Sequence, residues 1–321
     1  MNSLKKLVKV IRKSKRIAVA THFNPDGDGI AAALACAHLI RHYKRRKPVL
    51  YCHSPIPAKY QFLLGKTWQF VTEIPACDLI IAVDSPQISR VFAHMGHIRS
   101  ARLDAKTIVN IDHHKSNNGF GEICIIDRRA SSTSEIMYSI LAGLEVRIRK
   151  PLAEILYCGI YSDTGGFTYP NTTSKCLRVA ADLVATGVQA GPLIKKLNAK
   201  TLDGTLLLSK VLNTIEIHSG IGSMYLTQAM LNKNGATMAD SENFVSFLQA
   251  IEGVRVSIFL REEKKRTRIS FRSDGIVDVD RLARRFGGGG HRLAAGVLIK
   301  RELHEAKREM LKAIRAEMRK K

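Results

Sequence analysis

Short runs of apolar residues alternate along the first half of the chain with longer segments whose apolar residues recur every three or four positions. The short runs are rich in Val and Ile, which is typical of buried strands, and the longer segments have helical periodicity. Strand and helix alternation of this kind predicts an α/β domain with a parallel sheet. Predicted strands cover 16–21, 48–52, 79–84 and 107–112, and predicted helices cover 28–46, 131–144 and 151–161.

The pattern restarts near residue 220, after a segment at 195–218 whose leucines and isoleucines have the spacing of a helical connector. Beyond it, strands are predicted at 223–227, 254–261, 267–272 and 295–299, and helices at 241–251, at 279–286 and at the C-terminal end. We therefore expect two domains. The expected divisions are an N-terminal parallel-sheet domain over 1–190, a helical linker over 191–220 and a smaller α/β domain over 221–321.

The chain carries an excess of positive charge. Its 321 residues include 51 Lys and Arg against 28 Asp and Glu, which gives a formal net charge of +23. The basic residues gather in several segments, above all 1–20 and 41–47. A charge of this size favours binding to polyanions such as nucleic acid, and the simpler alternative is a highly soluble surface.

Apolar runs and cysteines exclude several classes of protein. No apolar run approaches the roughly 18 residues that a membrane span requires, and the apolar stretch at 17–20 is too short for a signal peptide. The six cysteines form no C-x-x-C pair, so we expect reduced core residues rather than a disulfide framework or a zinc knuckle. The sequence therefore predicts a cytoplasmic protein that does not bind membranes.

Polar side chains follow three of the predicted strands at the point where each strand ends. Because the carboxyl ends of parallel strands lie at one edge of the sheet, we expect these side chains to converge there. A turn with a helix N-cap is the alternative explanation for the first cluster. The side chains are His22, Asp26 and Asp28 after the first strand, Asp84 after the third, and Asp112, His113 and His114 after the fourth.

A further acidic residue, Asp163, follows an apolar helix and precedes two glycines, so that a bend can turn it toward the same edge. Four carboxylates within a few ångströms repel one another unless cations neutralise them. We therefore expect two divalent cations at this site. A mixed carboxylate and imidazole donor set favours manganese, with magnesium, cobalt, iron and zinc as alternatives.

Four consecutive glycines at 287–290 precede His291 in the second region. The run is either a flexible loop or a place where the backbone approaches a phosphate or a base closely. In the second interpretation Arg272 and His291 grip a terminal phosphate or nucleotide. Arg272 suits this task because its planar guanidinium can bind two phosphate oxygens at once.

These motifs resemble, in order and context, those of the DHH phosphoesterase superfamily. The N-terminal motifs are His22-x-x-Pro25-Asp26-x-Asp28, Asp84, Asp112-His113-His114-x-x-Asn117 and Asp163. The second region resembles the DHH-associated C-terminal domain through Phe271-Arg272-Ser273 and through the glycine run with His291 and Ala294-Ala295-Gly296. Together these two resemblances cover nearly the whole chain. They imply that the smaller domain over 221–321 is a substrate-binding domain, with a cleft between it and the N-terminal domain. The pairing is most similar to bifunctional oligoribonucleases (nanoRNases) that also hydrolyse 3'-phosphoadenosine 5'-phosphate (pAp).

The resemblance implies a role for each residue. It implies that His22 and Asp26 hold one metal, that Asp28, His113 and Asp163 hold the other, and that Asp84 bridges the two. His114 would act as a catalytic residue facing the scissile phosphate, and Asp112 would orient a ligand histidine through its other ring nitrogen. The implied substrate-binding residues are Arg272, Ser273, Gly288, Gly289, Gly290 and His291.

The implied activity is hydrolysis of short RNA or DNA oligonucleotides to mononucleotides, and of pAp to AMP, by water that two metals activate. A cyclic or linear dinucleotide phosphodiesterase and a RecJ-like single-strand exonuclease are alternatives of the same architecture. An inorganic pyrophosphatase of the superfamily would lack the glycine and histidine signature in its second domain. A non-catalytic RNA-binding protein would explain the charge but not the metal ligands. A homodimer is compatible with the sequence, which does not determine the oligomeric state.

Overall fold

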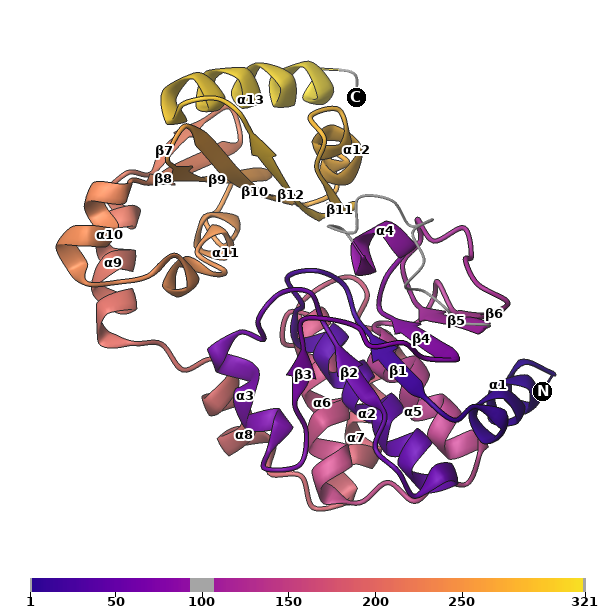
Figure 1. Ribbon diagram of the computed structural model, residues 1–321. Coiled ribbons are helices and arrows are strands. Elements are labelled where there is room, and N and C mark those ends of the chain that lie inside the picture. The colour runs from indigo at the N-terminus through magenta and orange to yellow at the C-terminus, as the bar shows by residue number, and fades with distance from the viewer. Residues whose placement is uncertain (1, 93–106, 320–321) are drawn as a thin grey trace. The chain divides into compact units, whose positions relative to one another are not determined.

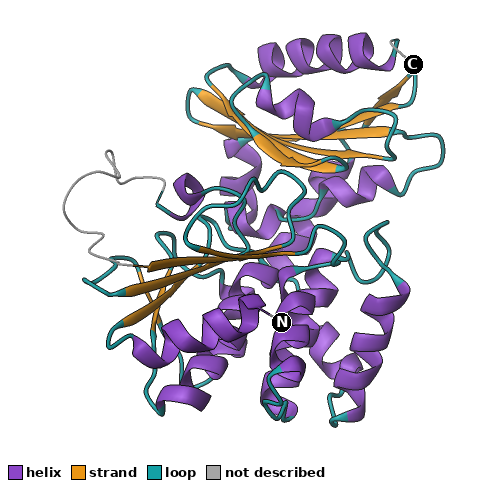
Figure 2. Ribbon diagram, turned by 90° about the vertical axis from the view of Figure 1, so that its right-hand side faces the viewer, coloured by secondary structure: helices purple, strands orange, loops and turns teal. Residues whose placement is uncertain are grey.

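The structure is a computed structural model that describes residues 2–92 and 107–319 (Figure 1). The chain divides into two compact units, Met1–Ala199 and Lys200–Lys321. Each unit contains one six-stranded sheet with helices against it, as the strand and helix pattern predicts (Figure 2). Within the described residues, no helix has both the length and the apolarity that crossing a membrane requires.

The sheet of the first unit is parallel throughout, with the strand order β3-β2-β1-β4-β5-β6. Its central strands β1 and β4 are buried along their whole length, which explains why they are continuous apolar runs. Alternate residues belong to different clusters: Val19 and Ile81 pack in the larger core, and Ala18 and Ile80 pack on the other face. The strands are β1 (Ile17–Ala20), β2 (Val49–Tyr51), β3 (Phe70–Val71), β4 (Leu79–Val83), β5 (Thr107–Asp112) and β6 (Ile123–Ile126).

The helices of the first unit supply most of its core. The described helices are α1 (Asn2–Lys13), α2 (Gly27–Lys44), η1 (Ala58–Tyr60), α3 (Gln61–Leu64), α4 (Ile88–Val91), α5 (Thr133–Gly143), α6 (Lys150–Asp163), α7 (Ser174–Ala185) and α8 (Ala190–Leu197). Helix α2 is rich in alanine and buried from Gly27 to Ala37, so that other helices can pack closely around it. It ends where Arg45 adopts a left-handed conformation, a common way for a helix to stop.

Close packing of α2, α5 and α6 depends on Gly159 in the middle of α6. A Cβ atom at this position would overlap the side chain of Ser134 in α5 and would lie 2.8 Å from the Cβ of Ala31 in α2. No larger residue fits unless a helix moves, because Cβ atoms do not approach so closely. The glycine therefore sets the separation of three helices that surround the end of the sheet.

The sheet of the second unit has the order β11-β12-β10-β9-β8-β7, and only the β8–β9 pair among its described neighbours is parallel. One face packs against α12 and α13, and part of the other packs against α9, α10 and α11. The strands are β7 (Glu216–His218), β8 (Ile221–Leu226), β9 (Val256–Glu263), β10 (Arg266–Ser273), β11 (Gly289–His291) and β12 (Ala294–Ile299), and the helices are α9 (Leu202–Leu212), α10 (Gln228–Asn234), η2 (Met238–Ser241), α11 (Val245–Gln249), α12 (Val279–Arg284) and α13 (Leu303–Met318).

Several predicted elements are confirmed and others are wrong. The apolar face of the last helix packs on its own unit as expected, since Leu303, Ala306, Met310 and Ile314 are buried there. The segment at 195–218, predicted as a helical connector, comprises the end of α8, helix α9 with its cap residue Thr201, and strand β7. Part of the glycine run forms the short strand β11 and is not a loop.

Candidate metal centre

The predicted acidic and histidine residues of the first unit lie together at the carboxyl edge of its sheet. These residues lie at or just after the ends of β1, β4 and β5, and Asp163 is the last residue of α6. The strand pattern predicts this convergence. Their donor atoms form groups in which every atom lies within 4.8 Å of the others. The groups are His22, Asp26 and Asp84; Asp28, His113 and Asp163; and Asp84, Asp112 and His114.

Asp84 lies between the first two groups. Its Oδ2 is 3.6 Å from Nε2 of His22, and its Oδ1 is 3.7 Å from Nε2 of His113. The backbone of Asp84 is left-handed, with φ 54°, a conformation that Asp tolerates better than most residues and that turns the side chain into the site. The two oxygens of one buried carboxylate therefore face two different histidines, an arrangement that suits a bridging ligand.

The histidines are oriented by backbone carbonyl groups. Nδ1 of His22 lies 2.9 Å from the carbonyl oxygen of Phe23, and Nδ1 of His113 lies 3.4 Å from that of Ala130. When each Nδ1 donates its proton to the carbonyl, Nε2 carries the lone pair and points at the carboxylates. Histidines that bind metals in proteins are usually held in this way.

Asp28 is held by the N-terminal end of α5. Its two carboxylate oxygens accept hydrogen bonds from the backbone N–H groups of Thr133, at 2.6 Å, and Ser134, at 2.9 Å. The hydroxyl group of Thr133 donates to Asp84 at 2.9 Å. Helix α5 is itself capped by Ser132, so the serine-rich segment at 131–134 begins a helix, as the predicted helix over 131–144 requires.

Asp26 has two tasks in this geometry. Its Oδ1 accepts from the backbone N–H groups of Asp28 and Gly29, so that it caps α2. The same oxygen lies 3.9 Å from Nε2 of His22, and the side chain is 55 % exposed. The N-cap that we considered as an alternative explanation is therefore present together with a position in the donor group. Gly29 is needed beside it, because a Cβ atom there would press on Thr21 and approach His22 and Asp84.

The crowding of buried carboxylates at this site favours positive charge there, as the pKa directions of three residues indicate. Burial raises the pKa of Asp28, and the nearby charges of Asp84 and Asp163 raise it further. Burial likewise raises the pKa of Asp163, together with the charges of Asp26 and Asp84. Burial alone would lower the pKa of His22, but its interactions with the carboxylates of Asp26 and Asp84 raise it well above the ordinary value.

Donors with these properties fit divalent cations. The separations of 3.4–3.9 Å between imidazole nitrogens and carboxylate oxygens exceed hydrogen-bond length. They are what two ligands bound at about 2 Å to one cation show. Carboxylate oxygens combined with imidazole nitrogens suit manganese, zinc, iron and related metals. The residues present therefore fit the metals that the sequence leads us to expect.

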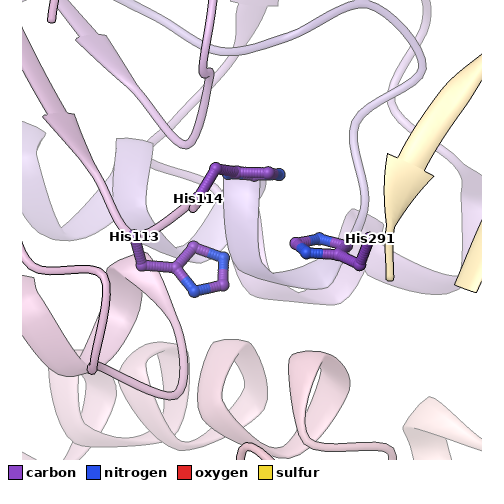
Figure 3. Close-up of side chains that lie close together, drawn as sticks. All are labelled: His113, His114 and His291. Atoms are coloured by element: carbon purple, nitrogen blue, oxygen red, sulfur yellow. The ribbon is translucent and has the colours of Figure 1, made fainter. Parts of the chain in front are cut away.

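Asp112 and His114 form a separate hydrogen-bonded unit beside this donor set. Nδ1 of His114 donates to Oδ1 of Asp112 at 2.7 Å, and the side-chain amide of Asn117 donates to Oδ2 at 2.6 Å. The same amide group contacts the carbonyl oxygen of Ser85 at 3.3 Å, so that the segments after β4 and β5 are tied together. Asp112 thus orients His114 rather than the predicted metal ligand His113. Figure 3 shows the imidazoles of these two neighbouring histidines.

The predicted substrate-binding residues of the second unit differ in the hydrogen bonds that their side chains make within the protein. Arg272 in β10 is half-buried, its Nη1 donates to the carbonyl oxygen of Phe271, and its buried Nε has no partner among the described residues. The hydroxyl group of Ser273 accepts from the backbone N–H groups of Gly275 and Val277, so that it shapes the following turn. His291 lies in β11.

The glycine run is explained in part by packing within the second unit. A Cβ atom at Gly288 or Gly290 would collide with the backbone of β12. The N–H of Gly290 donates to Asp280 at 2.8 Å and is therefore not free to bind a phosphate. A Cβ atom at Gly287 would meet nothing within 4 Å, but its φ of 81° favours glycine. A Cβ atom at Gly289 would approach only Asp280, at 3.6 Å, so neither packing nor a left-handed backbone explains the glycine there.

Sequence reasoning gave no role to several residues that support these sites. Thr133 and Ser134 hold Asp28, and the signal available was the serine-rich start of a helix. Arg261 in β9 also had no predicted role. Its Nη2 donates to the hydroxyl group of Ser270 at 3.0 Å, and its buried Nε has no partner among the described residues. It is paired across the sheet with Arg268, on the same face as Arg272.

This fold and this donor set define a two-domain α/β protein with a centre suited to divalent cations. Two family models match the chain: "DHH family, N-terminal domain" at residues 16–160 and "DHHA1 domain" at residues 222–320. The bifunctional oligoribonuclease and PAP phosphatase NrnA of Thermus thermophilus is 32% identical over 306 residues, which are 94% of this chain and 90% of the relative. The chain belongs to the DHH family.

Solved structures agree with this assignment. An exopolyphosphatase-related protein from Bacteroides fragilis has a TM-score of 0.88 and 26% identity, with 99% of this chain and 96% of that chain covered. RecJ of Thermus thermophilus in complex with Mn²⁺ has a TM-score of 0.54 and 13% identity, with 99% of this chain and 54% of that chain covered. The second likeness concerns the fold alone.

Proposed function

We propose that this protein is a metal-dependent phosphoesterase that hydrolyses short oligoribonucleotides to mononucleotides and pAp to AMP. The observation that carries the proposal is the placement of Asp84 between the imidazoles of His22 and His113, in a chain similar along almost its whole length to an oligoribonuclease and PAP phosphatase. The +23 charge supports nucleotides and oligonucleotides as substrates, because their phosphates are anionic.

The same residues would hold two divalent cations, of which manganese suits the donors best. His22 and Asp26 would bind one cation, Asp28, His113 and Asp163 would bind the other, and Asp84 would contact both. When bound, such cations acidify water so that it can attack phosphorus, and they neutralise phosphate oxygens.

His114 would hold or move a proton at the scissile phosphate. Its Nδ1–H is fixed on Asp112, so that Nε2 is the nitrogen that can accept or return a proton as the leaving oxygen departs. Asn117 fixes Asp112 in turn, which keeps the imidazole in one orientation before substrate binds.

The activity can be tested with four substrates and a chelator. We expect a labelled RNA dinucleotide and pAp to be hydrolysed with Mn²⁺ present, and all hydrolysis to stop after metal removal. Undiminished activity in chelator would refute the metal-dependent mechanism. Faster hydrolysis of a cyclic dinucleotide would instead indicate the dinucleotide phosphodiesterase, and processive degradation of long strands would indicate the RecJ-like exonuclease.

Replacement of Arg272 with Ala is expected to weaken substrate binding and to leave metal affinity unchanged. A lost charge-assisted contact to phosphate costs about 1–3 kcal/mol, so the Michaelis constant for a dinucleotide should rise about tenfold to a hundredfold. The matched control is Arg266→Ala, at the exposed opposite end of the same strand. Steady-state kinetics and calorimetric titration with Mn²⁺ measure the two effects. A defect in Mn²⁺ binding would place Arg272 in the metal centre instead.

A further inference from the structure

The proposed activity leaves the most basic part of the chain unexplained. Helix α1 contains no acidic residue, and its basic side chains are exposed at Lys5, Lys6, Lys9, Arg12 and Lys13. The C-terminal end of α2 and the residues after it are also basic. We define the basic surface as Lys5, Lys6, Lys9, Arg12, Lys13, Arg41, Lys44, Arg45, Arg46 and Lys47.

The two parts of the basic surface are in contact. The ammonium group of Lys44 donates to the carbonyl oxygen of Arg12 at 2.8 Å, and the Arg12 guanidinium lies 5.1 Å from the centre of the Tyr43 ring. A groove of about 630 Å³ lies along α1. Its walls include Lys5, Lys9, Arg12 and Lys13 of α1 together with Tyr43 of α2.

The positive charges on this surface are not neutralised by the protein. In residues 2–92 and 107–319, none of its ten basic side chains forms an ion pair with an acidic group. The basic helix α13 is different, because Glu305, Glu309 and Glu317 are interspersed among its cations. Ten cations gathered without counter-charges repel one another, and an anionic partner relieves this repulsion.

The basic surface lies far from the metal centre. Helix α2 begins beside Asp26 at the carboxyl edge of the sheet and runs for 18 residues to Lys44. At about 1.5 Å per residue its ends are about 27 Å apart. Helix α1 leads directly into the start of β1, so it lies at the amino edge. A dinucleotide held at the metal centre cannot reach this surface.

The chemistry favours a nucleic-acid backbone over a membrane. Helices that insert into membranes expose apolar side chains, but α1 buries Leu7 and Ile11 completely, and its Leu4 and Val10 pack against the core. Lys5, Lys9 and Lys13 stand one helical turn apart on one face, about 6 Å between neighbours. This repeat is comparable to the separation of consecutive phosphates along an extended strand.

We propose that the basic surface of α1 and the end of α2 binds the phosphate backbone of single-stranded RNA at a place separate from the metal centre. The choice of RNA as the occupant rests on the proposed function. Strands long enough to span both places gain affinity from the surface, and dinucleotides do not.

The test compares two triple variants by fluorescence anisotropy with a labelled long single-stranded RNA, in chelator so that the RNA is not cut. One variant carries Lys5→Gln, Lys9→Gln and Lys13→Gln on the basic surface. The control carries Arg308→Gln, Lys312→Gln and Arg315→Gln on α13, which removes the same charge from a helix of mixed sign. Glutamine preserves helix propensity, and circular dichroism with dinucleotide hydrolysis shows that both variants are folded.

We expect the α1 variant to bind RNA at least about tenfold more weakly at low salt, and the slope of log affinity against log salt to fall by about 2, since each phosphate contact to a single strand contributes about 0.7. The control should retain most of its affinity. Equal losses in both variants, or unchanged binding by the α1 variant, would overturn the proposal. Binding to anionic lipid vesicles is measured on the same variants. If the α1 variant lost vesicle binding and kept its RNA binding, the surface would bind a membrane and the proposal would be overturned. Normal RNA binding by a protein that hydrolyses no dinucleotide would leave the surface standing and refute the proposed function.

Discussion

Asp84→Asn is expected to lower the turnover of a dinucleotide more than a hundredfold and to weaken Mn²⁺ binding. Loss of a residue that only supports a metal ligand already costs ten- to a hundredfold, and Asp84 faces both histidines directly. Asparagine has the same shape, tolerates the left-handed backbone at φ 54° and can still accept the hydrogen bond from Thr133. The substitution therefore removes the negative charge and leaves the local fold in place.

The matched control for this substitution is Asp182→Asn, in α7. Asp182 accepts a hydrogen bond from the hydroxyl group of Tyr138 and belongs to none of the described donor groups. Steady-state hydrolysis of a dinucleotide and calorimetric titration with Mn²⁺ measure the two effects. If Asp84→Asn kept more than a tenth of the turnover, Asp84 would not bridge two cations.

Gly159→Ala is expected to destabilise the first unit by about 1–3 kcal/mol, the usual cost of overfilling a well-packed core. The added methyl group would force α6 away from Ser134 in α5 and Ala31 in α2. Because the backbone of Ser134 holds Asp28, the displacement would also disturb the metal centre and lower turnover.

Fluorescence of the chain's one tryptophan, Trp68, can follow this unfolding. Trp68 is buried in the first unit, so its emission during urea denaturation reports that unit rather than the second. The control is Gly191→Ala in α8, where a Cβ atom meets nothing within 4 Å and alanine should stabilise by up to about 1 kcal/mol. Equal midpoints for Gly159→Ala and the unsubstituted chain would show that α6 adapts without cost.

The edge of the first sheet could be predicted because its signals are local. Strands β1 and β4 are continuous apolar runs and β5 is largely apolar, and the acidic or histidine residues that the structure brings together lie at or just after the ends of these strands. The strand order was not needed for this prediction, because the carboxyl ends of all parallel strands meet at one edge of the sheet. Short edge strands gave no such signal: β3 has two residues, too few for any periodicity.

Contacts between distant segments could not be predicted in this way. The hydrogen bonds from Thr133 and Ser134 to Asp28 join residues more than a hundred positions apart. Neither segment has a sequence pattern that predicts contact with the other. Gly159 looks like any glycine in a helical pattern until its three-helix surroundings are known. The boundary between α8 and α9 could not be predicted for a related reason, since a hydrophobic period continues across Thr201 although that residue caps a new helix.

The span of the donor set along the chain, from His22 to Asp163, also has a consequence for biosynthesis. At about 5–20 residues per second, a ribosome needs on the order of ten seconds to deliver Asp163 after His22. A nascent chain that ends before α6 holds Asp26 and Asp84 but lacks Asp163 of the second group. The full donor set therefore exists only in a chain synthesised through α6, and a cation that needed all of these ligands would bind after most of the first unit has been made.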